Sequence, residues 1–244
     1  RRPEIRFIVS TGDNFYPTGV KSVRDPQFTN VFEKLYSGTF TKPLMWILSA
    51  GNHDHWGLPG QLQYGAVTSN RWYFPRPVFD IRFPMVSADP SKFGETGVIA
   101  VMDSYANGKS VDQQLQQLPS VMSTMKTTNN NADDQSQQNQ QKDQQQQKYW
   151  KIVVGHMPLY SGSNHGKEAH TYSQRPKYKN AFYKAKVNAY LNGDDHMLEV
   201  HRVKHDDGVS HDTIDYFTTG AGGGAHFYDS TVSSTTHLSF PYAK

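Results

Sequence analysis

The sequence contains no cysteine among its 244 residues. This absence excludes disulfide frameworks, thiolate zinc ribbons and thiol nucleophiles. Any transition metal bound by this chain must therefore be held by histidine, carboxylate, amide or phenolate groups. Histidine is the informative excess, because the chain carries 11 of them.

Long apolar runs are also missing. No run approaches the roughly 20 residues needed to cross a bilayer. The apolar part of the opening "RRPEIRFIVS" is too short for a signal peptide. Because a strand pattern begins almost at once, we expect the sequence to start inside a domain, with any targeting signal upstream.

Charge of one sign is not in large excess either. The 25 Lys and Arg residues against 22 Asp and Glu residues give a formal net charge of +3. The basic residues are scattered along the chain instead of forming a stripe, so no nucleic-acid partner is predicted.

Short apolar runs rich in β-branched or aromatic residues end in turn signals and predict buried strands. These runs occupy residues 5–10, 43–50, 96–104, 150–155, 187–193 and 213–220. Helices are predicted over 25–37, over 179–186, and over 111–125 with a break at Pro119. In the first helix one face is expected to carry Phe28, Val31, Phe32 and Leu35. Alternating strands and helices indicate an α/β architecture.

Residues 128–147, "TNNNADDQSQQNQQKDQQQQ", form a low-complexity segment almost free of apolar groups. Such a segment cannot offset its ordering entropy by burial, so we interpret it as a loosely structured surface insertion. A polar partner site is the alternative. The insertion lies between two predicted strands, and we expect residues 1–244 to form a single domain around it.

Metal-competent side chains follow glycines at the ends of several predicted strands. They stand in "TGDNFY", "GNHDHWG", "GHMPLY" and "NGDDHMLE". Each stretch alone is typical of a turn, since Gly, Asp and Asn are common turn residues. A turn needs no histidine, however, and the carboxyl ends of strands are where open α/β sheets bind ligands. The loops could therefore converge on one crevice.

The donors in these loops are imidazoles, carboxylates, an amide and a phenol. They are too many for one tetrahedral zinc but suit two ions of higher coordination that share a carboxylate. Two cations roughly 3.5 to 4 Å apart are a common device for displacement at phosphorus. A phenolate ligand favours a hard trivalent ion such as iron.

Together these motifs resemble the calcineurin-like metallophosphoesterases, and the tyrosine of "GDNFY" resembles the purple acid phosphatase branch of the tartrate-resistant type. The matching stretches are "GDNFY", "AGNHDHWG", "VVGHMPLYSGSNHG", "AYLNGDDHMLEV", "RWYFPRPVFDIRF" and "YFTTGAGGGAHF". The resemblance implies a sandwich of two mixed β-sheets flanked by helices. It also implies hydrolysis of phosphate monoesters through a hydroxide held by a dinuclear centre of Fe(III) and divalent Fe, Mn or Zn.

Carried over residue by residue, the resemblance makes Asp13 the bridge between the two metals. Tyr16 and His196 would bind the ferric ion, and Asn52 and His156 the divalent ion. His53 and His165 would be catalytic residues, which orient substrate oxygens or protonate the leaving group.

Two departures from the family pattern bear on this expectation. The family has an aspartate on the strand that opens the domain, and no such residue precedes Asp13 here. We therefore expect the chain to lack its first strand-helix unit and one iron ligand. In addition, the family has Gly-His-x-His where residues 193–196 are Gly-Asp-Asp-His. Asp194 would then be the ligand, which should favour Mn or Fe over Zn.

Other polar residues receive plainer interpretations. Those expected to be solvated are His201, His205 and His211 in "HRVKHDDGVSHD". Asp54 and His55 are assigned to loop hydrogen bonding, and Asp103 to a turn or to a place behind the site. Trp56 and Trp72 are expected to be packing residues, with lining of the substrate mouth as the alternative.

The resemblance leaves two functions open. The first is an acid phosphatase acting on a small phosphate monoester or a phosphoprotein. The second is a weakly active or inactive anchor in a membrane-associated complex, because the sequence is also similar to glideosome-associated scaffold proteins. Retained Tyr16 argues against a phosphodiesterase. The family implies a secreted or organelle-lumen location.

Overall fold

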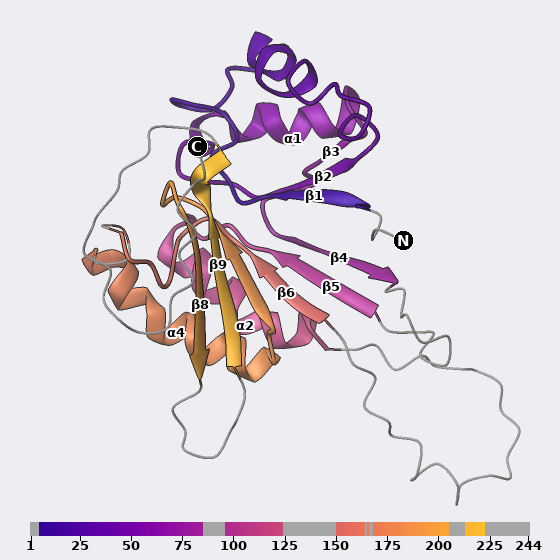
Figure 1. Ribbon diagram of the computed structural model, residues 1–244. Helices are drawn as coiled ribbons and strands as arrows, with labels where there is room; N and C mark the ends of the chain where they lie inside the picture. The colour runs from indigo at the N-terminus through magenta and orange to yellow at the C-terminus, as the bar shows by residue number, and fades with distance from the viewer. Residues whose placement is uncertain are drawn as a thin grey trace, which may run out of the picture.

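The computed structural model describes residues 5–84, 96–123, 150–163, 165, 168–204 and 213–222 (Figure 1). Its strands form two sheets. The smaller sheet has the order β1 (Phe7–Ser10), β2 (Met45–Leu48), β3 (Trp72–Tyr73). The larger has the order β4 (Phe79–Pro84), β5 (Thr96–Val101), β6 (Trp150–Val154), β7 (Ala189–Asn192), β9 (Thr213–Thr219), β8 (Leu198–Lys204).

The larger sheet is mixed. Strands β5, β6, β7 and β9 run parallel, and the outer strands β4 and β8 pair antiparallel with β5 and β9. The smaller sheet is parallel across its described strands. The predicted runs that contain β1, β2, β5, β6, β7 and β9 all form strands, which confirms the α/β expectation.

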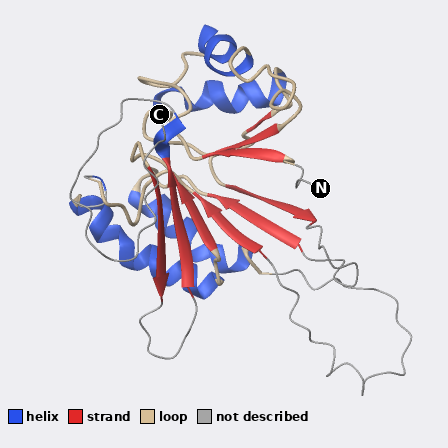
Figure 2. Cartoon of the chain, viewed as in Figure 1, coloured by secondary structure: helices blue, strands red, loops and turns tan. Residues whose placement is uncertain are grey.

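The two sheets pack against each other, and helices cover their outer faces (Figure 2). Alternate residues of β5 divide between the two resulting cores. Val98 and Ala100 pack with α2 (Gly108–Val121) and α4 (Ala169–Ala185). Ile99 and Val101 pack with the smaller sheet. Burial of each valine or isoleucine side chain contributes about 1.5 to 3 kcal/mol, so β5 stabilises the packing on both of its faces.

The helices differ in extent from the expected ones. α2 starts earlier than predicted, because Asn107 caps it by accepting a hydrogen bond from the Ser110 amide at 3.1 Å. Pro119 lies within its last turn and does not break it. α4 is much longer than the predicted 179–186, and it includes Pro176.

The helix predicted over 25–37 is instead a short π-helix, η1 (Phe28–Glu33). Phe28 and Phe32 are buried against Trp72, with ring centroids 5.6 and 4.8 Å away. Val31 and Leu35 are 43% and 65% exposed, so the expectation that they share the buried face is wrong. A π-helix has a wider turn than an α-helix, so Phe28 and Phe32, which are four positions apart, lie on the same face. Val31 and Leu35 each come three positions after one of these phenylalanines and point away from the core.

Several elements were not anticipated. They are η2 (His55–Gly57), α1 (Leu58–Val67), β3, β4, β8 and the 3-10 turn η4 (Gly220–Gly222). α1 contains two glycines and a proline, which weaken any helical signal. β8 falls partly in the stretch "HRVKHDDGVSHD", whose histidines were expected to be solvated.

Two plain interpretations are corrected. His201 lies on β8, is buried, and places Nε2 3.0 Å from Glu199 Oε2, so its expected solvation is wrong. Trp72 is buried as expected, but Trp56 is 82% exposed, because η2 turns its side chain outward. His205, His211 and the segment 128–147 lie outside the described residues. Within the described part of the chain, no helix is long and apolar enough to span a membrane.

Candidate metal centre

The loops after β1, β2, β6 and β7 bring the expected donors together. The carboxyl ends of β1 and of the parallel strands of the larger sheet point to the same edge of the sandwich (Figure 1). One donor atom each of Asp13, His156 and Asp194 lie within 4.8 Å of one another. Residues that are far apart in the chain therefore form one cluster.

Asp13 stands at the middle of this cluster. Its Oδ1 accepts a hydrogen bond from the His53 amide at 3.0 Å and lies 3.4 Å from His156 Nε2. Its Oδ2 accepts a hydrogen bond from the Tyr16 hydroxyl at 2.8 Å. The two carboxylate oxygens thus face two different donor groups, an arrangement compatible with a bridging carboxylate.

The first donor group surrounds His156, which is buried. Its Nδ1 donates to the Thr11 carbonyl at 2.7 Å, so its Nε2 faces the cluster. Asn52 Oδ1 lies 3.1 Å and Asp194 Oδ1 3.5 Å from that nitrogen. Oxygen atoms from three side chains therefore surround one imidazole nitrogen.

The carboxylates of Asp13 and Asp194 favour a positive charge between them. Burial lowers the pKa of His156, but hydrogen bonds to Asp13 and Asp194 and their charges raise it more, to about 10. Burial also opposes ionisation of Asp13 and Asp194, yet the pairing with His156 leaves the pKa of both carboxyls lowered. A proton supplies the compensating charge here, and a bound cation could replace it.

The second donor group lies on the other side of Asp13. The Tyr16 hydroxyl is 3.2 Å from His196 Nε2, and Tyr16 is 40% exposed. Burial, followed by the hydrogen bond to Asp13, raises the pKa of the Tyr16 phenol. Such a phenol ionises near neutral pH only beside a strong cation.

The two expected catalytic histidines occupy different places. The His53 ring lies against Tyr16, with centroids 4.6 Å apart, and its Nε2 is 3.9 Å from Asp13 Oδ2. His165 pairs through Nδ1 with Glu168 Oε1 at 2.8 Å. Burial lowers the pKa of His165, but the charge of Asp194 and the Glu168 contact leave it raised. His53 is thus part of the cluster, whereas His165 is linked to it by electrostatic attraction to Asp194.

Glycines allow the loops to approach this closely. Gly51 packs on Asp13 so tightly that a Cβ there would overlap Asp13 Oδ1 and the Asp13 backbone nitrogen. Gly12 has φ +96°, and a Cβ there would lie 2.6 Å from His156 Nδ1. The turn glycines of the motifs are therefore required for packing as well as for chain reversal.

Buried Asp54 holds the first two loops in register. Its carboxylate accepts hydrogen bonds from the amides of Asn14 and Gly51 at 3.0 and 2.9 Å, and from Gln61 Nε2 at 2.8 Å. Burial raises its pKa. This arrangement agrees with the loop role expected of Asp54, and His55 likewise bonds within the loops, with Nε2 2.9 Å from Asp103 Oδ1.

Sequence reasoning missed Tyr105, which donates a hydrogen bond to Asp194 Oδ2. The two residues are 89 positions apart, so no local pattern links them. The available signal was that Tyr105 follows β5, whose carboxyl end lies at the same edge as those of β6 and β7.

The donor atoms around Asp13 form two groups. Carboxylate, amide and imidazole donors lie on one side of Asp13, and phenol and imidazole donors on the other. Mixed oxygen and nitrogen donors divided in this way are typical of two-metal hydrolases, which include phosphatases, nucleases and aminopeptidases. The chain belongs to the calcineurin-like phosphoesterase family, whose model matches residues 1–198.

Known relatives agree with this assignment. The chain is 31% identical over 217 residues to tartrate-resistant acid phosphatase type 5 of rabbit (Oryctolagus cuniculus), covering 88% of this chain and 61% of that protein. It is 28% identical over 225 residues to purple acid phosphatase 4 of Arabidopsis thaliana, covering 90% and 59%. The chain thus spans about three fifths of these curated relatives.

A solved structure shares the fold. It is described as GAP50, the anchor in the inner membrane complex of Plasmodium, and it matches with a TM-score of 0.70 at 22% identity. The match covers 96% of this chain and 67% of that one. The resemblance to the metallophosphoesterases and to their purple acid phosphatase branch is therefore confirmed, and the match to GAP50 shows that the fold is shared.

Proposed function

We propose that the full-length protein is a metal-dependent phosphomonoesterase with a dinuclear centre. The observation that carries this proposal is the position of Asp13, whose two carboxylate oxygens face two separate donor groups. The similarity to tartrate-resistant and purple acid phosphatases supports it.

In this proposal Asp13 would be a ligand shared by the two ions. His156, Asn52 and Asp194 would hold a divalent ion, and Tyr16 and His196 would hold a ferric ion. When bound, the pair supplies Lewis acidity and neutralises charge on the phosphate oxygens during in-line displacement. Because Asp194 brings a hard anionic oxygen, this site would favour Mn or Fe over Zn as the divalent ion.

The histidines of the chain handle the substrate and its protons. His53, held against Tyr16 and through its amide to Asp13, orients a phosphate oxygen. His165 directs Nδ1 to Glu168, which leaves Nε2 as the atom that delivers a proton to the leaving oxygen. The charges of Asp194 and Glu168 raise the pKa of His165, which keeps it protonated in mildly acidic solution. The substrate is a small phosphate monoester or a phosphoprotein.

Metal analysis of the full-length protein with a visible spectrum tests this function most directly. We expect two metal ions per chain, a visible absorption band from the Tyr16 phenolate, and hydrolysis of an aryl phosphate at mildly acidic pH. A colourless, metal-free protein without hydrolysis would contradict the proposal.

A second candidate function is that of an anchor in a membrane-associated protein complex. The observation that favours it is the shared fold with GAP50, which is described as an anchor in the inner membrane complex. The replacement of a family histidine by Asp194 is compatible with weakened catalysis. Under either function we place the protein in an organelle lumen or outside the cell. The metal analysis above separates the two candidates.

A further inference from the structure

Tyr105 connects the loop after β5 to the loop after β7. Its hydroxyl donates to Asp194 Oδ2, and its ring lies beside His156 with centroids 5.6 Å apart. The other carboxylate oxygen of Asp194 lies 3.5 Å from His156 Nε2. Tyr105 therefore occupies one oxygen of Asp194 and leaves the other directed into the donor cluster.

The position of Tyr105 is itself fixed by its neighbours. Asp103 Oδ1 accepts a hydrogen bond from the Tyr105 amide at 3.2 Å and lies 2.9 Å from His55 Nε2. Gln114 of α2 forms two hydrogen bonds with the backbone of Asp103. Its Oε1 accepts from the Asp103 amide at 3.0 Å, and its Nε2 donates to the Asp103 carbonyl at 3.1 Å. The phenol is thus anchored through a helix and through the loop after β2.

Asp194 needs such a partner more than a histidine would. Its side chain is shorter than that of a histidine, and either of its two carboxylate oxygens can face the cluster. Its backbone is also left-handed, with φ +66°, a conformation that non-glycine residues rarely adopt. A hydrogen bond to a ligating carboxylate orients it and typically changes metal affinity about 10 to 100-fold.

We propose that Tyr105 is a positioning residue that makes Asp194 a one-oxygen ligand of the divalent ion. This inference rests on the proposed dinuclear function for its metal-dependent part. It assigns a role to a residue outside the family motifs, and it accounts for how this chain accommodates the exchange of histidine for aspartate.

The test uses the full-length protein and compares Tyr105→Phe with Tyr64→Phe. Tyr64 is a matched control, because its hydroxyl also donates to a carboxylate, Glu33 Oε1 at 3.1 Å. Titration with Mn(II) alone is expected to show affinity about 10-fold or more weaker in Tyr105→Phe, and unchanged affinity in Tyr64→Phe. Equal affinity in Tyr105→Phe and the wild type would overturn the inference.

Tyr105→Phe made in an Asp194→His background tests whether Tyr105 acts through Asp194. In Asp194→His, we expect Tyr105→Phe to change Mn(II) affinity less than twofold. A loss as large as that in the wild-type background would show that Tyr105 acts by some other route and would overturn the proposal.

A metal-free measurement separates this inference from the proposed function. The unfolding equilibrium is measured for the wild type, Tyr105→Phe, Asp194→Asn and the double variant without metal. A hydrogen bond to a charged group predicts coupling of about tenfold in the unfolding constant. If the wild type bound no metal, the proposed function would fail. The double-mutant cycle of Tyr105 and Asp194 would still test their hydrogen bond, because it is measured without metal. Additive effects in the cycle would overturn the inference.

Discussion

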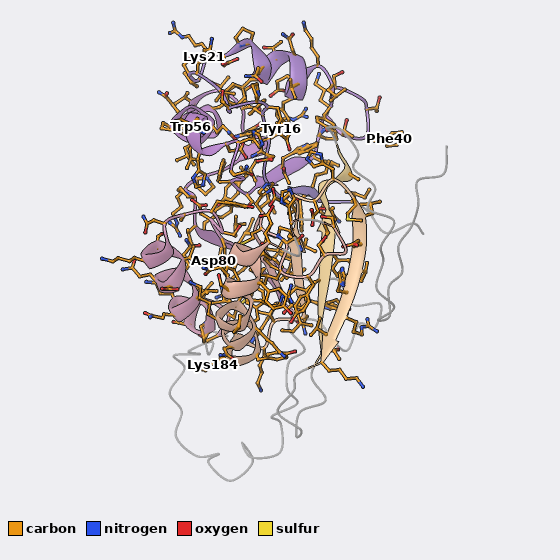
Figure 3. All side chains as sticks on the ribbon, turned by 90° about the vertical axis from the view of Figure 1, so that its left-hand side faces the viewer. Tyr16, Lys21, Phe40, Trp56, Asp80 and Lys184 are labelled. Carbon is orange, nitrogen blue, oxygen red and sulfur yellow. The ribbon has the colours of Figure 1, made fainter. Side chains whose placement is uncertain are left out.

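The Tyr16 hydroxyl lies 3.2 Å from His196 Nε2, although the two residues are 180 positions apart in the sequence. Tyr16 follows β1 of the smaller sheet and His196 follows β7 of the larger one. Their contact closes the second donor group of the centre, and it forms only because both sheets present strand ends at one edge. In Figure 3, Tyr16 lies in the upper part of the molecule and Lys184 of α4 near the lower end of the described ribbon.

Replacing the bridging carboxylate should remove metal binding. In Asp13→Asn, one ligating oxygen becomes an amide and the negative charge shared by both donor groups is lost. We expect metal affinity to fall by about 100-fold or more, measured by elemental analysis and Mn(II) titration. Asp80→Asn is the control, since Asp80 lies on β4 and contacts Arg82 instead of the centre. Full metal content in Asp13→Asn would refute the bridge.

Tyr16→Phe should separate colour from metal content. Loss of the phenol removes the only tyrosine expected to bind the ferric ion, so the visible band should disappear while most of the bound metal stays. Absorption spectroscopy with parallel metal analysis checks this. Tyr172→Phe serves as the control, because Tyr172 is 63% exposed and stacks on Arg175. A band that persists in Tyr16→Phe would mean that it does not come from this residue.

Gly51→Ala should damage both stability and the centre. The added Cβ would overlap Asp13, so either the loop or the carboxylate must move. We expect a loss of about 1 to 3 kcal/mol in unfolding free energy, as for other overpacked sites, together with weaker metal binding. Gly108→Ala is matched, because nothing lies within 4 Å of a Cβ at the start of α2. Equal unfolding curves for the two variants would contradict the close packing of Gly51.

His165→Asn should affect substrates according to their leaving groups. Removing a proton donor costs about 100 to 10,000-fold for a poor leaving group, because an alkoxide departs only when protonated. An aryl phosphate with an acidic phenol needs little such help. Hydrolysis rates of an alkyl and an aryl phosphate, compared in wild type and His165→Asn, measure this difference. Equal losses on both substrates would exclude His165 as the proton donor.

Asp25 should give a pH-dependent contribution to stability far from the centre. Its carboxylate accepts hydrogen bonds from the amides of Lys21 and Gln27 at 2.8 and 3.0 Å, and these bonds lower its pKa below the ordinary 3.8. A group with a lowered folded pKa stabilises the protein above its unfolded pKa, and this contribution is lost as the pH falls through the folded value.

Asp25→Ala should therefore cost about 1 to 2 kcal/mol at pH 7, and the difference from wild type should shrink below about pH 4. Urea unfolding at both pH values measures it. Asp112→Ala, which removes an exposed contact to Lys177 at 2.7 Å, should change stability by less than about 0.5 kcal/mol. A cost in Asp25→Ala that stays constant down to pH 3 would contradict the lowered pKa.

Local patterns predicted the strands β1, β2, β5, β6, β7 and β9, because β-branched runs bounded by glycine leave few other conformations, but they missed β3, β4 and β8. They predicted helix extents poorly. α4 has no regular apolar stripe, and its limits depend on the packing of Tyr178 and Phe182 into the core. The π-helix η1 likewise depends on aromatic contacts with Trp72.

The sequence by itself determined the α/β class and the donors that end the strands, including Asp13, Asn52 and His156, since these features depend on neighbouring residues. Only the tertiary structure decided that the oxygens of Asp13 face separate donor groups and that Tyr105 holds Asp194. It also decided that His201 is buried beside Glu199. The physical reason is that such contacts follow from strand order and sheet packing, which join residues with no periodic relation in the chain.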